Sequence, residues 1–438
     1  MGERMRPERS IPRSRISRIG KLGQLAGGLA LCAISQGTRQ LLRGERPSAS
    51  DLLLTPANAR RLSDRLSELR GAAMKVGQLI SMDSGQLLPE SVSELLSGLR
   101  ENAHPMPIGE INQVLSAAWG PEWSDAFGRF HFTPLASASI GQVHEAELKS
   151  GEHLAIKIQY PGVRQSIDSD VDNVAQLLKL FKQIPDHLDF KPILAEAKRQ
   201  LHEEADYCLE ARWLERYAQR LGDDARFKLP SVYREWTRET VLCMSYLDGG
   251  PIERQAGLPA EERNRIAAQL LELALKEVFR WRLVQTDPNF SNYRYDTRTG
   301  QIQLLDFGAT REYPEARRQA LKQLLQACLE DSEAAIVDAA GAVGYIGDED
   351  PQAYRHQVVT LLRMVSEPLR QTRYDFAHTD LVPRMSEVLI GMRLQASYGS
   401  LPPADVLFLH RKLGGLYLLL TRLKADLNVQ EILTRALF

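Results

Sequence analysis

Between residues 140 and 159, apolar and polar side chains alternate, which is typical of half-buried β-strands. The alternation covers 140–148 and 153–159, and Lys149-Ser150-Gly151-Glu152 lies between them as a turn sequence, so we predict a β-hairpin. Its second strand carries Lys157 in the sequence Ala-Ile-Lys. A protein kinase has a lysine in this context, where it neutralises the α- and β-phosphates. Exposed strand lysines are common, so Lys157 alone is weak evidence for a nucleotide site.

Most of the remaining chain repeats apolar residues at helical spacing. Helices are predicted over 51–101, near 108–118, over 164–190, over about 192–221 and over 261–282. Short strands are predicted over 229–233 and 240–247. Beyond residue 312 the predicted helices are 313–330, 331–343, 351–366, 380–396 and 403–423. Strands gathered in one part of the chain and helices in the rest are typical of the α+β class.

The strongest chemical signal lies between residues 285 and 308. Asp287 and Asn292 are five residues apart on a polar loop, and Asp306 opens the sequence Asp-Phe-Gly after an apolar run. In a kinase, such residues orient the nucleophile and hold Mg²⁺. Asp287 matches the catalytic position, and Asn292 and Asp306 match the metal positions. Asp-Pro and Ser-Asn also form ordinary turns, so the rest of the chain must decide.

The predicted helix over 192–221 carries the acidic run Glu-Glu-Ala-Asp-Tyr-Cys-Leu-Glu. In one continuous helix, Glu203, Tyr207 and Glu210 would share a face. Lys157 needs an acidic partner, and this helix can supply it. The alternative is a solvated acidic face. So many carboxylates are costly in one place unless a cation, such as Lys157 or the lysine at position 75, faces them.

The segment before Lys157 departs from an ordinary protein kinase. A loop that covers phosphates is expected to be glycine-rich, because close approach of the backbone leaves no room for a Cβ atom. Here the loop reads Ala136-Ser137-Ala138-Ser139, followed only by Gly141. An alanine-rich loop still offers amide and hydroxyl groups but is stiffer. We therefore expect altered nucleotide handling.

Composition and charge exclude several classes of protein. The net charge of −1 argues against a general polyanion binder, so no nucleic-acid partner is expected. The four cysteines form no Cys-x-x-Cys pair, which excludes a typical zinc cluster or disulfide framework and favours a reducing compartment. The nine histidines form no pair at ligand spacing. A chain of 438 residues is long enough for two lobes or two to three domains.

The N-terminal region has a different character. Residues 1–21 are basic, and the uncharged run 22–38 would form a helix of about 26 Å, whereas a bilayer core is about 30 Å thick. We favour a helix that lies on a membrane or is marginally inserted. A secretory signal, a transit peptide and a buried soluble helix are the alternatives. The apolar run 407–420 is interrupted by His410-Arg411-Lys412, so no membrane span is predicted there.

Several of these motifs occur together, in the same order, in one known family. They are Lys75-Val76-Gly77-Gln78, Ala136–His144, Ala155–Val163, Glu204-Ala205-Asp206-Tyr207, Gln285–Asn292 and Leu305–Gly308. Over roughly 50–438 the chain resembles the UbiB/AarF atypical kinase-like family, in the branch associated with ubiquinone (coenzyme Q) biosynthesis. The resemblance implies a two-lobed protein-kinase-like fold. The implied parts are a tail and apolar segment (1–50), a helical extension (51–125), a β-rich N-lobe (126–247) and a helical C-lobe (248–438).

The resemblance also implies roles for particular residues. Lys75 and Gln78 would be regulatory, with Lys75 reaching the acids Glu204 and Asp206. Glu210 is then the better candidate partner for Lys157, with Glu204 second.

The nucleotide would contact the alanine loop 136–139, together with Met244 and Tyr246 on the adenine side. Two departures from the family pattern are Ser137, where alanine is usual, and Ser245-Tyr246, where Glu-Leu is frequent. The first affects nucleotide preference and the second the adenine pocket.

The resemblance implies an ATPase that uses ATP and Mg²⁺ and supports ubiquinone biosynthesis at a membrane. The alternatives are a phosphotransferase acting on a protein or small molecule, and a nucleotide-gated scaffold for biosynthetic enzymes. Expected partners are anionic lipid, proteins or intermediates of quinone biosynthesis, and a second copy of the chain. The expected location is a membrane surface, with the lobes in a bacterial cytoplasm or on the matrix side of the mitochondrial inner membrane.

Overall fold

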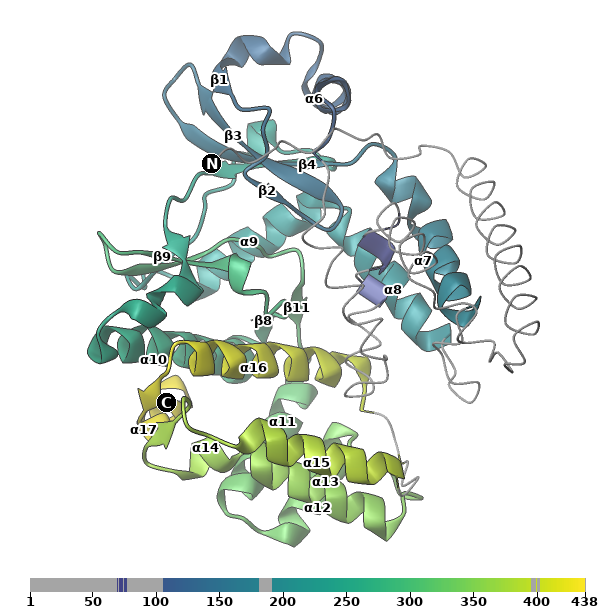
Figure 1. The fold of residues 1–438 in the computed structure, drawn as a ribbon, viewed down its shortest axis with the longest axis vertical. Coiled ribbons are helices and arrows are strands. Elements are labelled where there is room, and N and C mark those ends of the chain that lie inside the picture. Colours follow the sequence, from purple (N-terminus) through teal and green to yellow (C-terminus); the bar gives the residue numbers. More distant parts are fainter. Residues whose placement is uncertain are drawn as a thin grey trace, which may run out of the picture. The chain divides into compact units, whose positions relative to one another are not determined.

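The fold is described from a computed structural model of the chain (Figure 1). The structure describes residues 69, 71–73, 75–76, 105–180, 191–394, 399 and 402–437. The predicted tail and apolar segment 1–50, and Gln78, lie outside the described residues. The chain forms two compact units. One holds residues up to Ala211 together with Ser231–Tyr246, and the other holds Arg212–Pro230 together with Leu247–Phe438.

The first unit is built on an antiparallel sheet in the order β1-β3-β4-β6, with β2 paired to β3. The strands are β1 (Phe127–Phe130), β2 (Ala136–Ser137), β3 (Gly141–Leu148), β4 (His153–Gln159) and β6 (Val241–Ser245). Strands β3 and β4 pair from Gly141↔Gln159 to Glu147↔His153, which confirms the predicted hairpin. The predicted strand over 229–233 is wrong. Only an isolated bridge between Val232 and Met244 forms there.

Because side chains alternate along β4, its core residues lie on one face of the sheet and Lys157 lies on the other. Leu154, Ile156 and Ile158 are fully buried in a core that also includes residues of helix α6 (Ile108–Trp119). Successive strand side chains point to opposite faces, so Lys157 lies on the other face of the sheet. The register places it between Val143 of β3 and Leu242 of β6.

Three helices complete the described part of the first unit and lead into the second. They are α7 (Val163–Leu180), α8 (Lys191–Glu204) and α9 (Tyr207–Leu221). The prediction of one helix over 192–221 is wrong, because the chain breaks at Ala205-Asp206. The Asp206 carboxylate accepts a hydrogen bond of 3.0 Å from the backbone N–H of Leu209, so it caps a new helix. Glu203 therefore does not share a helical face with Glu210.

The second unit contains small sheets that frame two loops. One sheet has the order β5-β10-β9-β7, and β11 pairs with β8 in another. These strands are β5 (Phe227–Lys228), β7 (Gly250–Pro251), β8 (Leu283–Gln285), β9 (Tyr293–Asp296), β10 (Gln301–Leu304) and β11 (Thr310–Glu312). A further short pair joins β12 (Tyr374–Asp375) and β13 (Asp426–Leu427).

Helices make up most of the second unit. They are α10 (Ala260–Lys276), α11 (Glu315–Leu329), α12 (Glu333–Val343), α13 (Gln352–Val365), α14 (Glu367–Arg370), α15 (Leu381–Leu394), α16 (Ala404–Arg422) and α17 (Val429–Leu437). The long helices predicted from the apolar periodicity are confirmed, whereas α14 and α17 were not predicted. Helix α10 continues as a π-helical turn, Glu277–Trp281.

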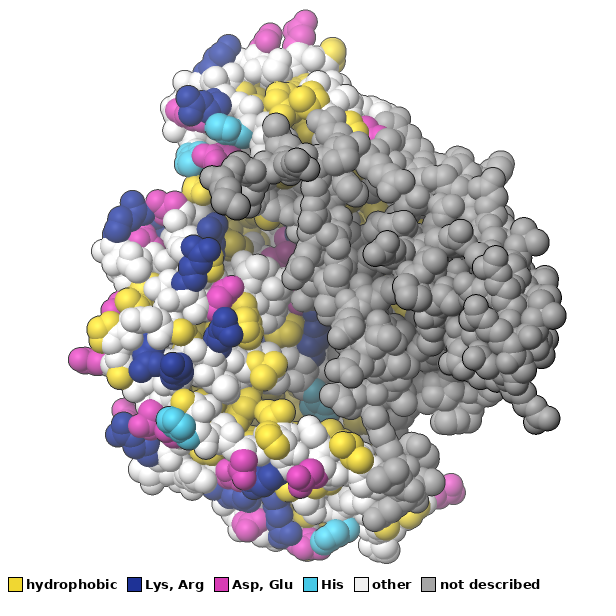
Figure 2. Space-filling view, in the orientation of Figure 1, with side chains coloured by type: hydrophobic (Ala, Val, Ile, Leu, Met, Phe, Trp, Pro, Cys, Tyr) yellow, Lys and Arg dark blue, Asp and Glu magenta, His cyan; other side chains and the backbone are white. Residues whose placement is uncertain are grey.

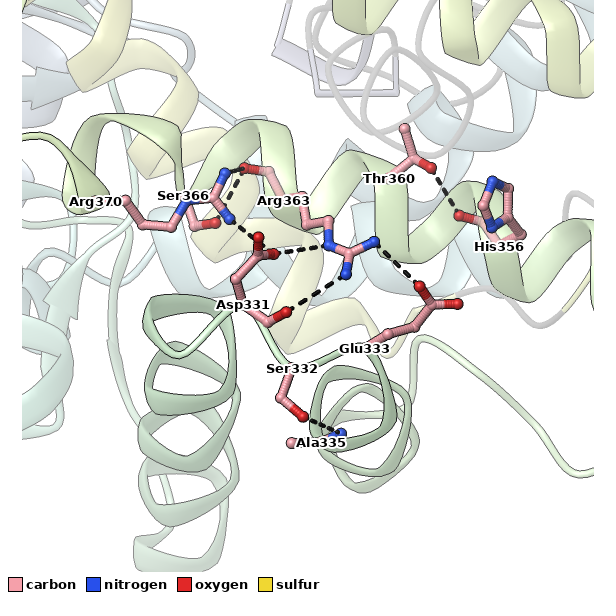
Figure 3. A network of polar contacts seen from close by, with 9 residues as sticks. All are labelled: Asp331, Ser332, Glu333, Ala335, His356, Thr360, Arg363, Ser366 and Arg370. Atoms are coloured by element: carbon pink, nitrogen blue, oxygen red, sulfur yellow. Dashed lines mark hydrogen bonds and ion pairs between the residues drawn. The ribbon is translucent and has the colours of Figure 1, made fainter.

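A polar network fastens the turn between α11 and α12 to α13 (Figure 3). Asp331 accepts hydrogen bonds of 2.8 Å from Arg363 Nε and 3.3 Å from Arg370 Nη1. Arg363 also donates to Glu333, and the Ser332 hydroxyl caps α12.

On the face drawn in Figure 2, the described basic side chains are interspersed with acidic ones. Within the described ranges no helix has the length and apolarity to cross a bilayer.

Candidate active site

In the first unit, the lysine of the hairpin forms a buried ion pair with an acidic side chain of α9. Lys157 Nζ lies 2.9 Å from both carboxylate oxygens of Glu210 on α9. Both residues are buried, with exposed fractions of 8% and 3%, and the ring of Tyr207 lies 5.2 Å from the ammonium. The structure therefore decides between the two candidate partners in favour of Glu210. Breaking a buried pair of this kind is strongly destabilising, so the ammonium is held firmly in place.

Glu204 connects three segments of the first unit. Its Oε1 pairs with buried Lys75, and its Oε2 accepts a hydrogen bond of 3.0 Å from the Ser139 hydroxyl. The expectation that Lys75 reaches this acid is confirmed. Asp206, the second acid of the motif, caps α9. Glu204 thus couples the extension to the loop that precedes β3.

The alanine loop is tied into the hairpin. Ala136 and Ser137 pair with β3, and Ala138 donates its backbone N–H to Gly141 O at 2.8 Å. A Cβ atom on Gly141 would lie 2.3 Å from Ile158 O. This glycine is therefore required by the packing of β3 on β4.

The two residues expected on the adenine side lie at the end of the sheet. Met244 pairs with Ala155 and is buried. The Tyr246 ring stacks on the exposed His153, with ring centroids 4.3 Å apart. Tyr246 also donates its backbone N–H to His153 O at 2.9 Å. Its ring is thus engaged by β4.

In the second unit, Asp287, Asn292 and Asp306 lie on two loops that are hydrogen-bonded to each other. Leu305 donates to Asn292 O at 3.0 Å, and Gln285 Nε2 donates to Asp306 O at 3.2 Å. The first bond continues the hairpin of β9 and β10, in which Leu304 lies opposite Tyr293, and the second comes from the last residue of β8. The loops that carry the three predicted residues are therefore adjacent.

Hydrogen bonds orient the three side chains. Asn292 Nδ2 donates to Asp287 Oδ2 at 2.9 Å, which leaves the amide oxygen of Asn292 for another ligand. Asp306 Oδ1 accepts from Gly308 N at 2.9 Å. Phe307 is 1% exposed and packs on Tyr217, with ring centroids 4.8 Å apart. The buried phenylalanine anchors the loop that carries Asp306.

The donor set fits a magnesium ion that is held together with phosphate. Asn292 and Asp306 offer hard oxygen atoms, and Mg²⁺ is commonly bound by one or two such side chains plus substrate phosphates. No group of three or more His, Cys, Asp or Glu residues with metal-binding geometry occurs among the described residues. The oxygen atoms present suit a Mg²⁺–nucleotide complex.

A buried polar network that the sequence did not reveal lies beside these loops. Lys412 of α16 is 3.0 Å from Glu277 Oε2 and donates to Tyr293 at 2.9 Å. Glu277 Oε1 accepts from Tyr217 at 2.7 Å and from Gln285 N at 3.3 Å. Burial alone would lower the pKa of Lys412, but the attraction and hydrogen bonding of Glu277 and Tyr293 together outweigh it, so the pKa is raised.

Arg411 is the second residue that the sequence did not reveal. Its Nη2 forms an ion pair with Asp287 Oδ1, and the two side chains are 12% and 24% exposed. The sequence showed Arg411 and Lys412 only as interruptions of an apolar helix. The available signal was that consecutive cations occur in an otherwise apolar helix, where charge is costly without a partner.

Residues 98–340 match the family described as the ABC1 atypical kinase-like domain, which is more than half of the chain. The chain belongs to this family. The predicted recognition as a UbiB-type atypical kinase-like protein is therefore confirmed. The matched range includes the hairpin with Lys157 and the two loops of the second unit. Lys75 precedes this range, and Arg411 follows it.

Relatives in the ABC1 family match nearly the whole chain. The chain is 34% identical over 427 residues to the mitochondrial atypical kinase COQ8 of Saccharomyces cerevisiae, and the match covers 97% of this chain and 85% of the relative. It is 34% identical over 431 residues to mitochondrial COQ8B of Rattus norvegicus, covering 97% and 81%. The solved Rv3197–erythromycin complex from Mycobacterium tuberculosis has a TM-score of 0.60 at 24% identity and covers 86% of this chain and 94% of that one. It shows the same fold, and the relatives confirm the predicted branch.

Proposed function

We propose that this chain is an ATP-binding atypical kinase-like enzyme that hydrolyses ATP in support of ubiquinone biosynthesis. The observation that carries the proposal is the pair of hydrogen-bonded loops in the second unit. One loop carries the candidate base Asp287 hydrogen-bonded to Asn292, and the other loop, which is bonded to it through Leu305, carries Asp306. Phosphoryl transfer on a kinase scaffold needs these groups and a lysine held by a carboxylate, which Lys157 and Glu210 supply.

Each residue has a defined part in the proposal. Asn292 and Asp306 would hold Mg²⁺, which neutralises charge on the phosphates when bound. Lys157 would bind the α- and β-phosphates, because Glu210 fixes its ammonium group. Asp287 would orient the attacking water and accept its proton.

The segment after Asp-Phe-Gly favours water or a small molecule as the acceptor. Only residues 309–314 separate Gly308 from α11, and strand β11 pairs directly with β8 in this interval. Tyr313 is buried and donates to the backbone oxygen of Asp405 at 2.9 Å. In protein kinases the activation loop occupies the corresponding place. The chain therefore has little room there for a loop that would order a peptide substrate.

Membrane association is part of the proposal and is supported by the basic N-terminal residues 1–21. Basic segments bind anionic lipid surfaces, with about 1 kcal/mol per Lys or Arg near the surface. We propose that this region brings the enzyme to the membrane that holds quinone intermediates. The first two relatives described above are named as mitochondrial. Vesicle binding that weakens as salt rises is the expected behaviour.

The first experiment compares the Asp306→Asn variant with the unchanged protein in Mg-ATP. At about 100 times the dissociation constant, ATP is expected to stabilise the unchanged protein by about 2.7 kcal/mol. The variant is expected to lose most of this gain, which thermal unfolding measures. Asp223→Asn, an exposed change outside the two loops, is the matched control. An unchanged nucleotide effect in Asp306→Asn would contradict the metal assignment.

The second experiment measures ATP turnover with and without anionic vesicles and a phenolic mimic of a quinone precursor. Release of phosphate with no phosphorylated mimic supports ATP hydrolysis. Transfer of labelled γ-phosphate to the mimic would instead identify a phosphotransferase. Turnover that persists in Asp287→Asn would contradict the role given to this carboxylate.

A further inference from the structure

Arg411 contacts the carboxylate to which the proposed function assigns the attacking water. One N–H of its guanidinium pairs with Asp287 Oδ1, while Asn292 holds Oδ2 at 2.9 Å. A guanidinium has five N–H donors in a planar fork. The structure describes Asp287 as the partner of the Arg411 guanidinium. The other N–H groups of Arg411 can therefore donate to a phosphoryl group that lies next to Asp287.

The loop itself carries no cation. Between Asp287 and Asn292 the sequence is Pro-Asn-Phe-Ser, and Asn289 uses its side chain to cap the following 3-10 turn. Charge on the transferred phosphoryl group is spread over three oxygen atoms in the transition state. Kinases and GTPases stabilise it with metal ions, and GTPases add an arginine. Arg411 brings a cation to this loop from another helix.

Helix α16 is fastened next to the loop on both sides of Arg411. Its residues at 408, 411, 412 and 415 share one face, because they follow helical spacing. The Phe408 ring lies 4.0 Å from the Arg311 guanidinium. A Cβ atom on Gly415 would lie 2.1 Å from Pro288 Cβ, so the backbone of the helix lies against the proline ring of the catalytic loop. With buried Lys412 next to it, Arg411 has little freedom to move away from Asp287.

We propose that Arg411 is a further catalytic residue, an arginine supplied in cis that contacts the γ-phosphoryl group during its transfer. Before nucleotide binds, the guanidinium holds Asp287 in place. During the reaction, the water oxygen bonds to the γ-phosphorus, and the bond from phosphorus to the bridging oxygen breaks. ADP leaves with that electron pair, and the proton of water passes through Asp287 to solvent. Arg411 stabilises the charge on the phosphoryl oxygen atoms as these bonds change.

This inference rests on the proposed function, so its test measures two separate properties. Arg411→Met removes the cation, and Arg411→Gln retains a side chain that can donate to Asp287. Arg422→Met is the control, since Arg422 is an exposed arginine on the same helix. Binding of ADP alone is compared with binding of ADP and aluminium fluoride, a mimic of the transferred phosphoryl group, both with Mg²⁺. ATP turnover gives kcat and KM for the same proteins.

Both Arg411 variants are expected to bind ADP as the unchanged protein does but to lose the extra affinity given by aluminium fluoride. Their kcat is expected to fall by about 100-fold or more, with a small change in KM, because the contact forms in the transition state. If Arg411→Met fails to fold, Arg411→Gln alone decides the question. An Arg411→Gln variant with undiminished kcat and undiminished tightening by aluminium fluoride would overturn this role. If the unchanged protein neither binds nor hydrolyses ATP, the proposed function fails instead.

Discussion

The buried pair between Lys412 and Glu277 gives the sharpest test of how the second unit is held together. Replacing Lys412 with Met keeps the length of the side chain and removes its charge. Glu277 is then left fully buried with Tyr217 and Gln285 on Oε1 and without the ammonium on Oε2. A buried carboxylate that has lost its cation is far more costly than one that is paired.

The magnitude follows from this geometry. The two side chains are 4% and 0% exposed, so solvent gives the remaining carboxylate almost no compensation. Breaking such a pair typically costs about 3–5 kcal/mol. For a unit of this size each kcal/mol lowers the melting temperature by about 2–4 °C, so we expect a decrease of roughly 6–20 °C.

Thermal unfolding of three variants checks this prediction. Lys322→Met makes the same chemical change at an exposed position on α11 and is expected to have little effect. The double variant Lys412→Met with Glu277→Gln removes both charges and is expected to recover about 1–3 kcal/mol relative to Lys412→Met alone. The reasoning is refuted if Lys412→Met unfolds at the same temperature as Lys322→Met. It is also refuted if neutralising Glu277 brings no recovery.

Two further predictions concern other positions of the second unit. The pKa of Glu272 is lowered from 4.5 to about 2, chiefly by its hydrogen bond with Arg226. The ionised Glu272 carboxylate therefore stabilises the fold above pH 4.5, and this stabilisation is lost as the pH falls toward 2. The Glu272→Gln variant should show a smaller decrease of melting temperature on acidification than the unchanged protein. An equal decrease in the two proteins would contradict this prediction. Gly415→Ala should destabilise the fold by about 1–3 kcal/mol, because the added Cβ atom would collide with Pro288. Gly414→Ala, whose Cβ atom meets nothing within 4 Å, should be tolerated in the same unfolding assay. Equal melting temperatures of the two variants would contradict the close approach of the helix to Pro288.

The sequence was sufficient for features that depend on local pattern. Alternation of apolar residues located the hairpin that carries Lys157, and helical spacing located most long helices of the second unit. The spacing of Asp287, Asn292 and Asp306 identified the candidate phosphoryl-transfer loops. These features are encoded by residues close in the chain, so one sequence is enough to find them.

Local patterns failed where a side chain has two competing uses. The acidic run predicted one continuous helix, but Asp206 is used as a cap and starts a new helix. Spacing along a continuous helix therefore gave the wrong face for Glu203. Only the folded arrangement shows that Glu210 pairs with Lys157 while Glu204 pairs with Lys75.

The tertiary structure alone decided which distant residues support the loops. Arg411 and Lys412 are more than a hundred positions from Asp287 and Glu277, and no periodicity links them. Their charges are tolerated in an apolar helix because the fold places a carboxylate opposite each one. A sequence lists the charges, but the free energy of a buried charge depends on its partner, and three-dimensional packing chooses that partner.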